Sequence, residues 1–333
     1  MRYFHPKDAT VAITYQCNAR CTMCNIWQKK SPPVMPAEYF ENLSPDLLHI
    51  NISGGEPFLH PDLPAIAKII KRKCPRASID ISSNGIATEL IIDTVKKISK
   101  IDPKIGVRIS LDGLKDTHDR IRGLPGVFDA AMATIAGLRK LKITNLGFGF
   151  TIQDENAGEL IKVYDLARQM NLQLSLALVQ NSELYFSKTS NKLNLAEKIS
   201  DSLDQIIKKE LSGWKLKNWL RAYFDYGLKH NFLTGLRLLP SGAGYDSMFI
   251  DPSGDVYPSM LIGLKMGNLG QEPLDKIWNS TKAGDIREKM MRESISESWV
   301  ICTVRQQIRQ NKFKVLWWIL KNKLFGYEGS ANK

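Results

Sequence analysis

The chain has 333 residues, of which 43% are hydrophobic and 24% are charged, a globular balance that excludes disordered and fibrous classes. Its longest strongly apolar run, at 315–320, is far shorter than the roughly 20 residues of a membrane span, and the N-terminus lacks the apolar segment of a secretory signal. We therefore expect a cytoplasmic protein, whose net charge of +12 permits anionic partners without selecting one.

Strand and helix patterns alternate along the first 180 residues. Such βα units, repeated about every 30 residues, are typical of a parallel sheet whose strands are joined by helices. Six units are visible in residues 1–181, too few for a complete eight-stranded barrel. The sequence predicts strands at 10–15, 48–53, 77–82, 106–111, 146–152 and 172–179, and helices at 36–43, 62–73, 88–99, 127–141 and 157–170.

Three further segments follow. Residues 182–236 predict a helical connection, with the strongest helical patterns at 195–211 and 215–229. Residues 237–302 no longer show a continuous helical pattern. A strand, a Pro-Ser-Gly turn and a second strand predict a hairpin within 241–257, followed by short helices at 274–278 and 285–291. Residues 303–333 form a tail with seven Lys or Arg and one Glu, a net charge of +6.

Three of the five cysteines, Cys17, Cys21 and Cys24, stand in the spacing C-x3-C-x2-C directly after the first predicted strand. Clustered thiolates are soft ligands that suit iron–sulfur clusters or zinc. A structural zinc site takes four ligands, and no fourth ligand lies nearby, since we interpret Cys74 as a small buried apolar residue. A four-iron cluster on three cysteines leaves one iron open to another ligand, which favours a catalytic cluster.

At these residues the sequence resembles the radical S-adenosylmethionine (radical SAM) superfamily. The resemblance implies an α/β fold built as a partial (β/α)6 TIM-type barrel. It also implies one [4Fe–4S] cluster on Cys17, Cys21 and Cys24, with SAM on the open iron. Reductive cleavage of SAM would give a 5′-deoxyadenosyl radical that abstracts hydrogen from the substrate, and a flavodoxin-type or ferredoxin-type protein would supply the electron.

Further family motifs follow the predicted strands in order, at the strand ends where α/β barrels place functional groups. They are Ser53-Gly-Gly-Glu-Pro57, Ser82-Ser-Asn-Gly85 and Ser110-Leu-Asp-Gly113, followed by Arg122. Each motif alone is more often a turn or a solvated charge than a site, but their order after consecutive strands makes that interpretation improbable. The resemblance implies SAM contacts from Met23, Gly54, Gly55, Glu56, Ser82, Asn84, Ser110, Asp112, Arg122 and Gln180.

Residues 237–302 resemble the SPASM domain, a small α+β domain that carries auxiliary iron–sulfur clusters in relatives. Where relatives have cluster cysteines, this chain has Ser241, Ser259 and Ser298, with Ser294 or Ser296 nearby, and only Cys302 remains. Serine is a poor ligand for an iron–sulfur cluster. Either the protein has lost its auxiliary clusters naturally, or it is an engineered Cys→Ser variant; both explanations predict a single cluster.

The tail places Trp317, Trp318 and other apolar residues among six Lys or Arg within 303–325. A basic helix with paired tryptophans suits a membrane interface, where it would make the protein peripheral. The alternative, which we favour, is a helix that packs its apolar face on the barrel. No RNA-binding motif supports a nucleic-acid partner.

Only nine residues precede Thr10, which leaves no room there for a peptide-binding domain. This favours a small-molecule substrate, such as a sugar nucleotide or a lipid-linked metabolite. The alternative is a radical SAM/SPASM maturase that modifies a peptide. A non-catalytic iron–sulfur or zinc scaffold is a third hypothesis, but it would not need the SAM-binding motifs.

Overall fold

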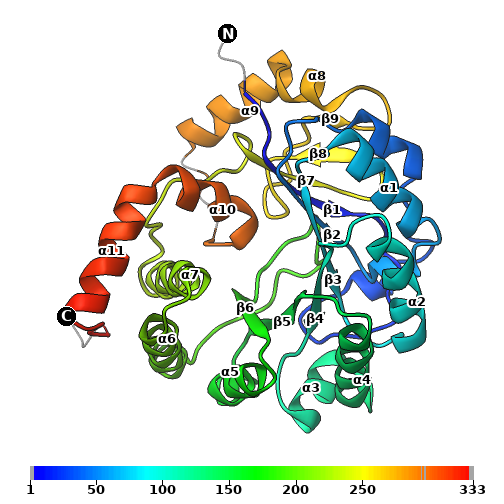
Figure 1. The fold of residues 1–333 in the computed structure, drawn as a ribbon. Helices are drawn as coiled ribbons and strands as arrows, with labels where there is room; N and C mark the ends of the chain where they lie inside the picture. The colour runs from blue at the N-terminus through cyan, green and yellow to red at the C-terminus, as the bar shows by residue number, and fades with distance from the viewer. Residues whose placement is uncertain (1–3, 294, 296–297, 330–333) are drawn as a thin grey trace.

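The computed structural model describes residues 4–293, 295 and 298–329. Within these residues, one sheet has the strand order β6-β5-β4-β3-β2-β1-β7-β8-β9. Figure 1 shows this sheet curving through the centre of the molecule, with helices along its outer side. The six predicted strands are confirmed as parallel neighbours: β1 (Asp8–Ala12), β2 (His49–Ser53), β3 (Ser78–Ser83), β4 (Gly106–Ser110), β5 (Asn145–Ile152) and β6 (Gln173–Leu178).

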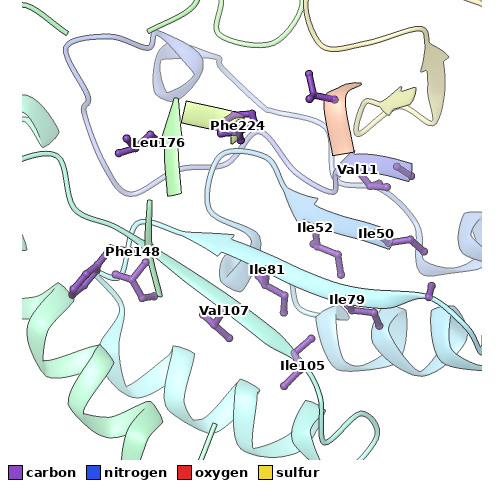
Figure 2. Close-up of a cluster of buried hydrophobic side chains, with 14 of the residues drawn as sticks. Val11, Ile50, Ile52, Ile79, Ile81, Ile105, Val107, Phe148, Leu176 and Phe224 are labelled. Atoms are coloured by element: carbon purple, nitrogen blue, oxygen red, sulfur yellow. The ribbon is translucent and has the colours of Figure 1, made fainter. Parts of the chain in front are cut away.

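Alternation along the strands separates the helix-facing core from the barrel interior. The register places Ile52 beside Ile81 and Ile81 beside Val107, so these side chains form one apolar layer (Figure 2). Burying each of them contributes about 1.5–3 kcal/mol. The helices that cover the sheet are α1 (Leu63–Lys73), α2 (Thr88–Ser99), α4 (Val127–Lys140) and α5 (Leu160–Gln169), followed by α6 (Ala196–Ser212) and α7 (Leu216–Thr234).

Two local predictions need correction. The helix predicted at 36–43 is a short 3-10 helix, η2 (Ala37–Asn42), in which only Phe40 is buried. A further helix, α3 (Lys115–Arg122), was not predicted. Its sequence is almost entirely polar and carries no apolar periodicity.

The C-terminal region extends the barrel sheet. Strand β7 (Ser247–Ile250) pairs in parallel with β1, and then forms the predicted hairpin with β8 (Asp255–Tyr257). Strand β9 (Gly267–Asn268) and the helices α8 (Leu274–Trp278) and α9 (Thr281–Arg292) follow. The hairpin was therefore predicted correctly, but its parallel pairing with the first strand was not.

The tail forms two helices, α10 (Ile301–Gln310) and α11 (Lys312–Leu324), separated at Asn311. Helix α10 lies against β1 and β7, and α11 lies against α6 and α7. The tail therefore packs on the fold through α10 and one face of α11, but the prediction that its apolar face covers the barrel is wrong for α11, where Phe313, Trp317 and Leu324 are exposed. No helix in the described part of the chain combines the length and apolar character that crossing a membrane requires.

A polar network closes the end of the barrel where the parallel strands begin. His49 lies between Asp8, at 3.3 Å, and Asp80, at 2.8 Å, and these residues stand on β1, β2 and β3. Arg305 of α10 donates to Asp8 at 2.7 Å. Since this end is occupied by paired side chains, the opposite end, where the strands finish, is open for a functional site.

Candidate active site

The three clustered cysteines lie on one loop at the carboxyl end of β1, and all three are half-buried. Polar groups reach two of the sulfur atoms: Asn84 Nδ2 lies 3.9 Å from Cys17 Sγ, and Arg122 Nη1 lies 3.6 Å from Cys21 Sγ. Burial raises the pKa of Cys17 to about 12 and that of Cys24 to about 11. A metal would therefore have to displace the thiol protons when it binds.

This donor set fits an iron–sulfur cluster better than a single ion. Among the described residues, no three His, Cys, Asp or Glu side chains converge on a point that one metal ion could occupy. A four-iron cluster binds its three thiolates on different iron atoms, so it does not require such convergence. N–H groups directed at the sulfur atoms are among the features that tune such clusters.

Two glycines after β2 bring the next turn against the cysteine loop. Gly54 has a φ of +139°, and a Cβ atom there would lie 2.2 Å from the Thr14 carbonyl oxygen. At Gly55 a Cβ would lie 2.2 Å from the Gln16 carbonyl oxygen. The Gly55 N–H donates to Thr14 O at 2.7 Å. Close approach of the chain to itself therefore requires glycine at both positions.

Glu56 is fully buried at the end of this turn and is hydrogen-bonded to the next strand. Its carboxylate accepts from the backbone N–H of Asn84 at 2.7 Å and from Ser83 Oγ at 3.0 Å. Burial raises the pKa of Glu56 to about 7, although these hydrogen bonds oppose the shift. Glu56 thus joins the ends of β2 and β3. Nearby, Ser82 donates to Asn51 of β2 at 3.0 Å.

Asp112 and Arg122 form a buried ion pair beside Cys21. The other carboxylate oxygen of Asp112 accepts from the backbone N–H of Thr151 at 2.8 Å. Burial lowers the pKa of Arg122, but the charges of Asp112 and Cys21 outweigh that effect and raise it overall. Ser110, at the end of β4, is half-buried. The predicted residues at the strand ends therefore lie close together, and one of them, Asp112, pairs with Arg122 of α3.

A segment at 181–191, here called the covering segment, was not predicted as part of the site. Asn191 Nδ2 donates to the carbonyl oxygens of Met23, at 3.1 Å, and Gln180, at 3.0 Å. The Tyr185 hydroxyl donates to Gly54 O at 3.1 Å. This segment has no periodic pattern, so only the tertiary structure reveals that it lies over both the cysteine loop and the glycine turn.

Aromatic rings from distant segments pack beside the cysteines. Tyr185 lies 5.2 Å from Phe249, and Phe249 lies 6.3 Å from Tyr257, measured between ring centroids. Tyr15 completes the buried group, against which Cys17 and Cys24 pack. Because Phe249 and Tyr257 stand on β7 and β8, the C-terminal region forms one wall of the site.

The residues of the C-terminal region do not fit an auxiliary cluster. Ser259 is buried, and its Oγ accepts from the Leu261 N–H at 3.1 Å. Apolar side chains, Ala243, Ile262 and Met290, pack together in the segments next to these serines. Ser241 likewise accepts from the Ala243 N–H at 3.1 Å.

The remaining positions add no thiol cluster among the described residues. Ser298 is half-buried, and Ser294 and Ser296 lie outside the described residues. Cys302 is buried in α10. Cys74 is fully buried, and its thiol donates to Ser44 O at 3.2 Å, which agrees with its interpretation as a core residue.

Comparisons with known protein families match both the barrel region and the C-terminal region of the chain. The family described as the radical SAM superfamily matches residues 11–167. The SPASM family, described as an iron–sulfur cluster-binding domain, matches residues 242–303. The second description disagrees with the serines at 241, 259 and 298, which offer no thiolate.

Three relatives illustrate the range of similar enzymes. The Fe-coproporphyrin III synthase of Methanosarcina barkeri is 32% identical over 47% of this chain, which spans 40% of that relative. The AdoMet-dependent heme synthase of the same organism is 23% identical over 83% of both chains. The mycofactocin maturase MftC of Mycobacterium tuberculosis is 24% identical over 76% of this chain and 64% of its own length.

Solved structures share the fold. The enzyme anSMEcpe, with bound AdoMet and a peptide, aligns with a TM-score of 0.62 at 19% identity, over 84% of this chain and 82% of that one. Streptococcus suis SuiB, bound to its precursor peptide SuiA, aligns with a TM-score of 0.62 at 16% identity, over 85% of this chain and 66% of that one. The matches show a radical SAM domain at residues 11–167 and a C-terminal SPASM domain at residues 242–303, and enzymes of the radical SAM superfamily use a [4Fe–4S] cluster and S-adenosylmethionine.

Proposed function

We propose that this radical SAM enzyme acts on a peptide, and that Cys17, Cys21 and Cys24 hold its only cluster. When bound, the cluster and SAM supply a 5′-deoxyadenosyl radical that abstracts hydrogen from the substrate, with the electron coming from a flavodoxin-type or ferredoxin-type protein. We assign to SAM Met23 of the cysteine loop, Arg122 of α3, and the residues at or just after the strand ends: Gly54, Gly55, Glu56, Ser82, Asn84, Ser110, Asp112 and Gln180.

The observation that carries the substrate proposal is a cavity of about 520 Å³ at the carboxyl end of β6. Gln180 and Asn181 line it from that strand end, Asn231 and Phe232 from α7, and Ile262 and Ser298 from the C-terminal region. Asn191 connects the cavity to the cysteine loop, because its side chain donates to the carbonyl oxygens of Gln180, which lines the cavity, and of Met23 in that loop. A bound substrate would therefore lie close to the cofactors.

The chemistry of the lining favours a neutral, partly apolar ligand. None of the described residues that line the cavity is Lys, Arg, Asp or Glu. A sugar nucleotide carries phosphates and a porphyrin precursor carries carboxylates, and such anions are typically bound by Arg or Lys. A neutral peptide needs no such cation, and its apolar side chains would pack against the leucine and isoleucine side chains that line the cavity.

The relatives support this choice over the sugar nucleotide that we expected from the sequence. Besides the mycofactocin maturase, the similar proteins include two from Bacillus subtilis: the subtilosin biosynthesis protein AlbA and the sporulation killing factor maturation protein SkfB. The haem-related synthases make a porphyrin the competing substrate class.

Isotope transfer distinguishes these substrates. The reconstituted enzyme is incubated with SAM, a reductant and one deuterated pool: neutral peptides, coproporphyrin III or a uridine diphosphate sugar. We expect deuterium in 5′-deoxyadenosine only from the peptide pool, and less of it in the Asn231→Asp variant, which introduces charge into the cavity. Deuterium from the porphyrin or the sugar nucleotide, with none from peptides, would contradict the proposal.

A further inference from the structure

Helix α11 has one face bound to the protein and one face without a partner in the described chain. The bound face buries Val315 and Ile319. Between them, Trp318 stacks on Tyr226 of α7 with ring centroids 4.9 Å apart. These contacts fix the rotation of the helix, and therefore determine which side chains point away from the fold. Figure 1 shows α11 at the outer edge of the molecule, beside α6 and α7.

The outward face is strongly apolar. Phe313 is 79% exposed, Trp317 is 71% exposed and Leu324 is 75% exposed. Positions 313, 317, 320 and 324 recur every three or four residues, so they lie on one side of the helix. We call this the α11 surface, and it comprises Phe313, Leu316, Trp317, Leu320, Leu324 and Phe325. Exposed apolar residues are ordinary when scattered, but a continuous patch marks an interaction site.

A second exposed tryptophan continues the surface. Trp214, in the turn between α6 and α7, is 85% exposed. Lys323 of α11 lies 4.6 Å from the centre of its ring. The same lysine donates to the carbonyl oxygens of Leu211, at 2.7 Å, and Gly213, at 3.0 Å. The contact therefore holds this turn against the end of α11.

Lysine side chains predominate around the surface, although the exposed Glu328 follows α11 by four residues. From Trp299 to Tyr327 the sequence contains no Asp or Glu, whereas Lys312, Lys314 and Lys321 on α11 are exposed. Lys215 is exposed next to Trp214. Lysine side chains can lie along an apolar surface while their ammonium groups reach phosphate oxygens. The basic rim therefore complements a negatively charged partner.

We propose that the α11 surface binds the enzyme peripherally to an anionic lipid bilayer. Tryptophan and phenylalanine flanked by lysine suit the boundary between the acyl chains and the headgroups of a bilayer. Without such a partner, these aromatic side chains would remain exposed to water. With 13 residues, α11 is too short to cross a bilayer, so it lies along the interface. Attraction to acidic headgroups adds to the apolar contact and makes binding sensitive to salt.

Vesicle cosedimentation tests this proposal with the full chain. One vesicle preparation contains phosphatidylcholine with 30% phosphatidylglycerol, and the other contains phosphatidylcholine alone. We expect at least tenfold tighter binding to the anionic vesicles, weakened at least fivefold by 0.5 M salt. Phe313→Glu with Trp317→Glu should reduce that binding at least tenfold. Met291→Glu, at a 64% exposed apolar residue of α9, should leave it unchanged.

Three outcomes would overturn the proposal. The first is a full-length protein that does not bind anionic vesicles at low salt. The second is a double variant that binds them as tightly as the unmodified protein while its melting temperature is unchanged. The third is a dimer in sedimentation equilibrium that the double variant dissociates without any vesicle binding, which would assign the surface to a second copy. None of these measurements depends on SAM cleavage or on the peptide substrate.

Discussion

The backbone N–H of Asn84 donates a 2.7 Å hydrogen bond to the Glu56 carboxylate, which ties the turn after β2 to the end of β3. The Asn84 side chain continues the connection, because its Nδ2 donates to Asn18 Oδ1 in the cysteine loop at 2.7 Å. Contacts within the protein thus link the ends of three strands. We expect this linkage to matter for both stability and cofactor binding.

Glu56→Gln should weaken the linkage. The amide replaces one accepting oxygen with a donor, so one of the present donors, Asn84 N–H or Ser83 O–H, loses its acceptor. We expect the free energy of unfolding to fall by about 1–3 kcal/mol in urea denaturation, and SAM to bind more weakly. Glu89→Gln, at an exposed position of α2, is the matched control and should change stability by less than about 0.5 kcal/mol. Equal free energies of unfolding for the two variants would contradict the role of Glu56 in linking β2 to β3.

Arg122→Ala should destabilise the fold strongly, because Arg122 is buried beside Asp112. It would leave Asp112 buried without its positive partner, at a cost of about 3–5 kcal/mol in unfolding free energy. Adding Asp112→Asn should recover part of that loss, because no unpaired charge then remains buried. Arg120→Ala, at an exposed residue of the same helix, serves as the control. If the double variant is no more stable than Arg122→Ala, the ion pair does not carry the effect.

Iron content tests the serines of the C-terminal region. Since Ser241, Ser259 and Ser298 provide no thiolate, we expect about four irons per reconstituted chain. Replacing Cys17, Cys21 and Cys24 together by alanine should remove nearly all of this iron. Eight or more irons on the unmodified chain would contradict the single-cluster account. Cysteine at positions 241, 259 and 298 would raise the number of irons per chain only if the apolar residues around these positions leave space for a second cluster.

Asp246 should make stability depend on pH. It accepts from Gln307 at 2.8 Å and Gln310 at 3.0 Å, both on α10, and burial raises its pKa to about 6 in spite of these bonds. A raised carboxyl pKa stabilises the fold below the unfolded value near 4, and this contribution is lost as the pH rises through 6. The loss is about 3 kcal/mol. Asp246→Asn should therefore lose less stability than the unmodified chain between pH 4.5 and 7.5, measured by urea denaturation; equal losses would contradict this.

The sequence predicted the six core strands and the cysteine loop because both depend on local patterns. Residues such as Ile52 and Ile81 mark buried strands, and the cysteine spacing is continuous in the chain. The pairing of β7 with β1 joins Val11 to Ile250, far apart in sequence, and no local pattern specifies it.

The covering segment and α3 were missed for related reasons. The segment around Tyr185 has no periodicity, and α3 has almost no apolar stripe. The tail was predicted as one helix, and its separation into α10 and α11 at Asn311 depends on two different packing partners.

Formation of 5′-deoxyadenosine tests the central claim that Cys17, Cys21 and Cys24 hold the cluster that cleaves SAM. The full chain, reconstituted with iron and sulfide under anaerobic conditions, is given SAM and a reductant, and the product is measured by chromatography. We predict that the unmodified chain and Cys74→Ala, which changes a core thiol, both form it. Each single alanine variant at positions 17, 21 and 24 should form none. A variant at any of the three that keeps about four irons and still forms 5′-deoxyadenosine would contradict the assignment.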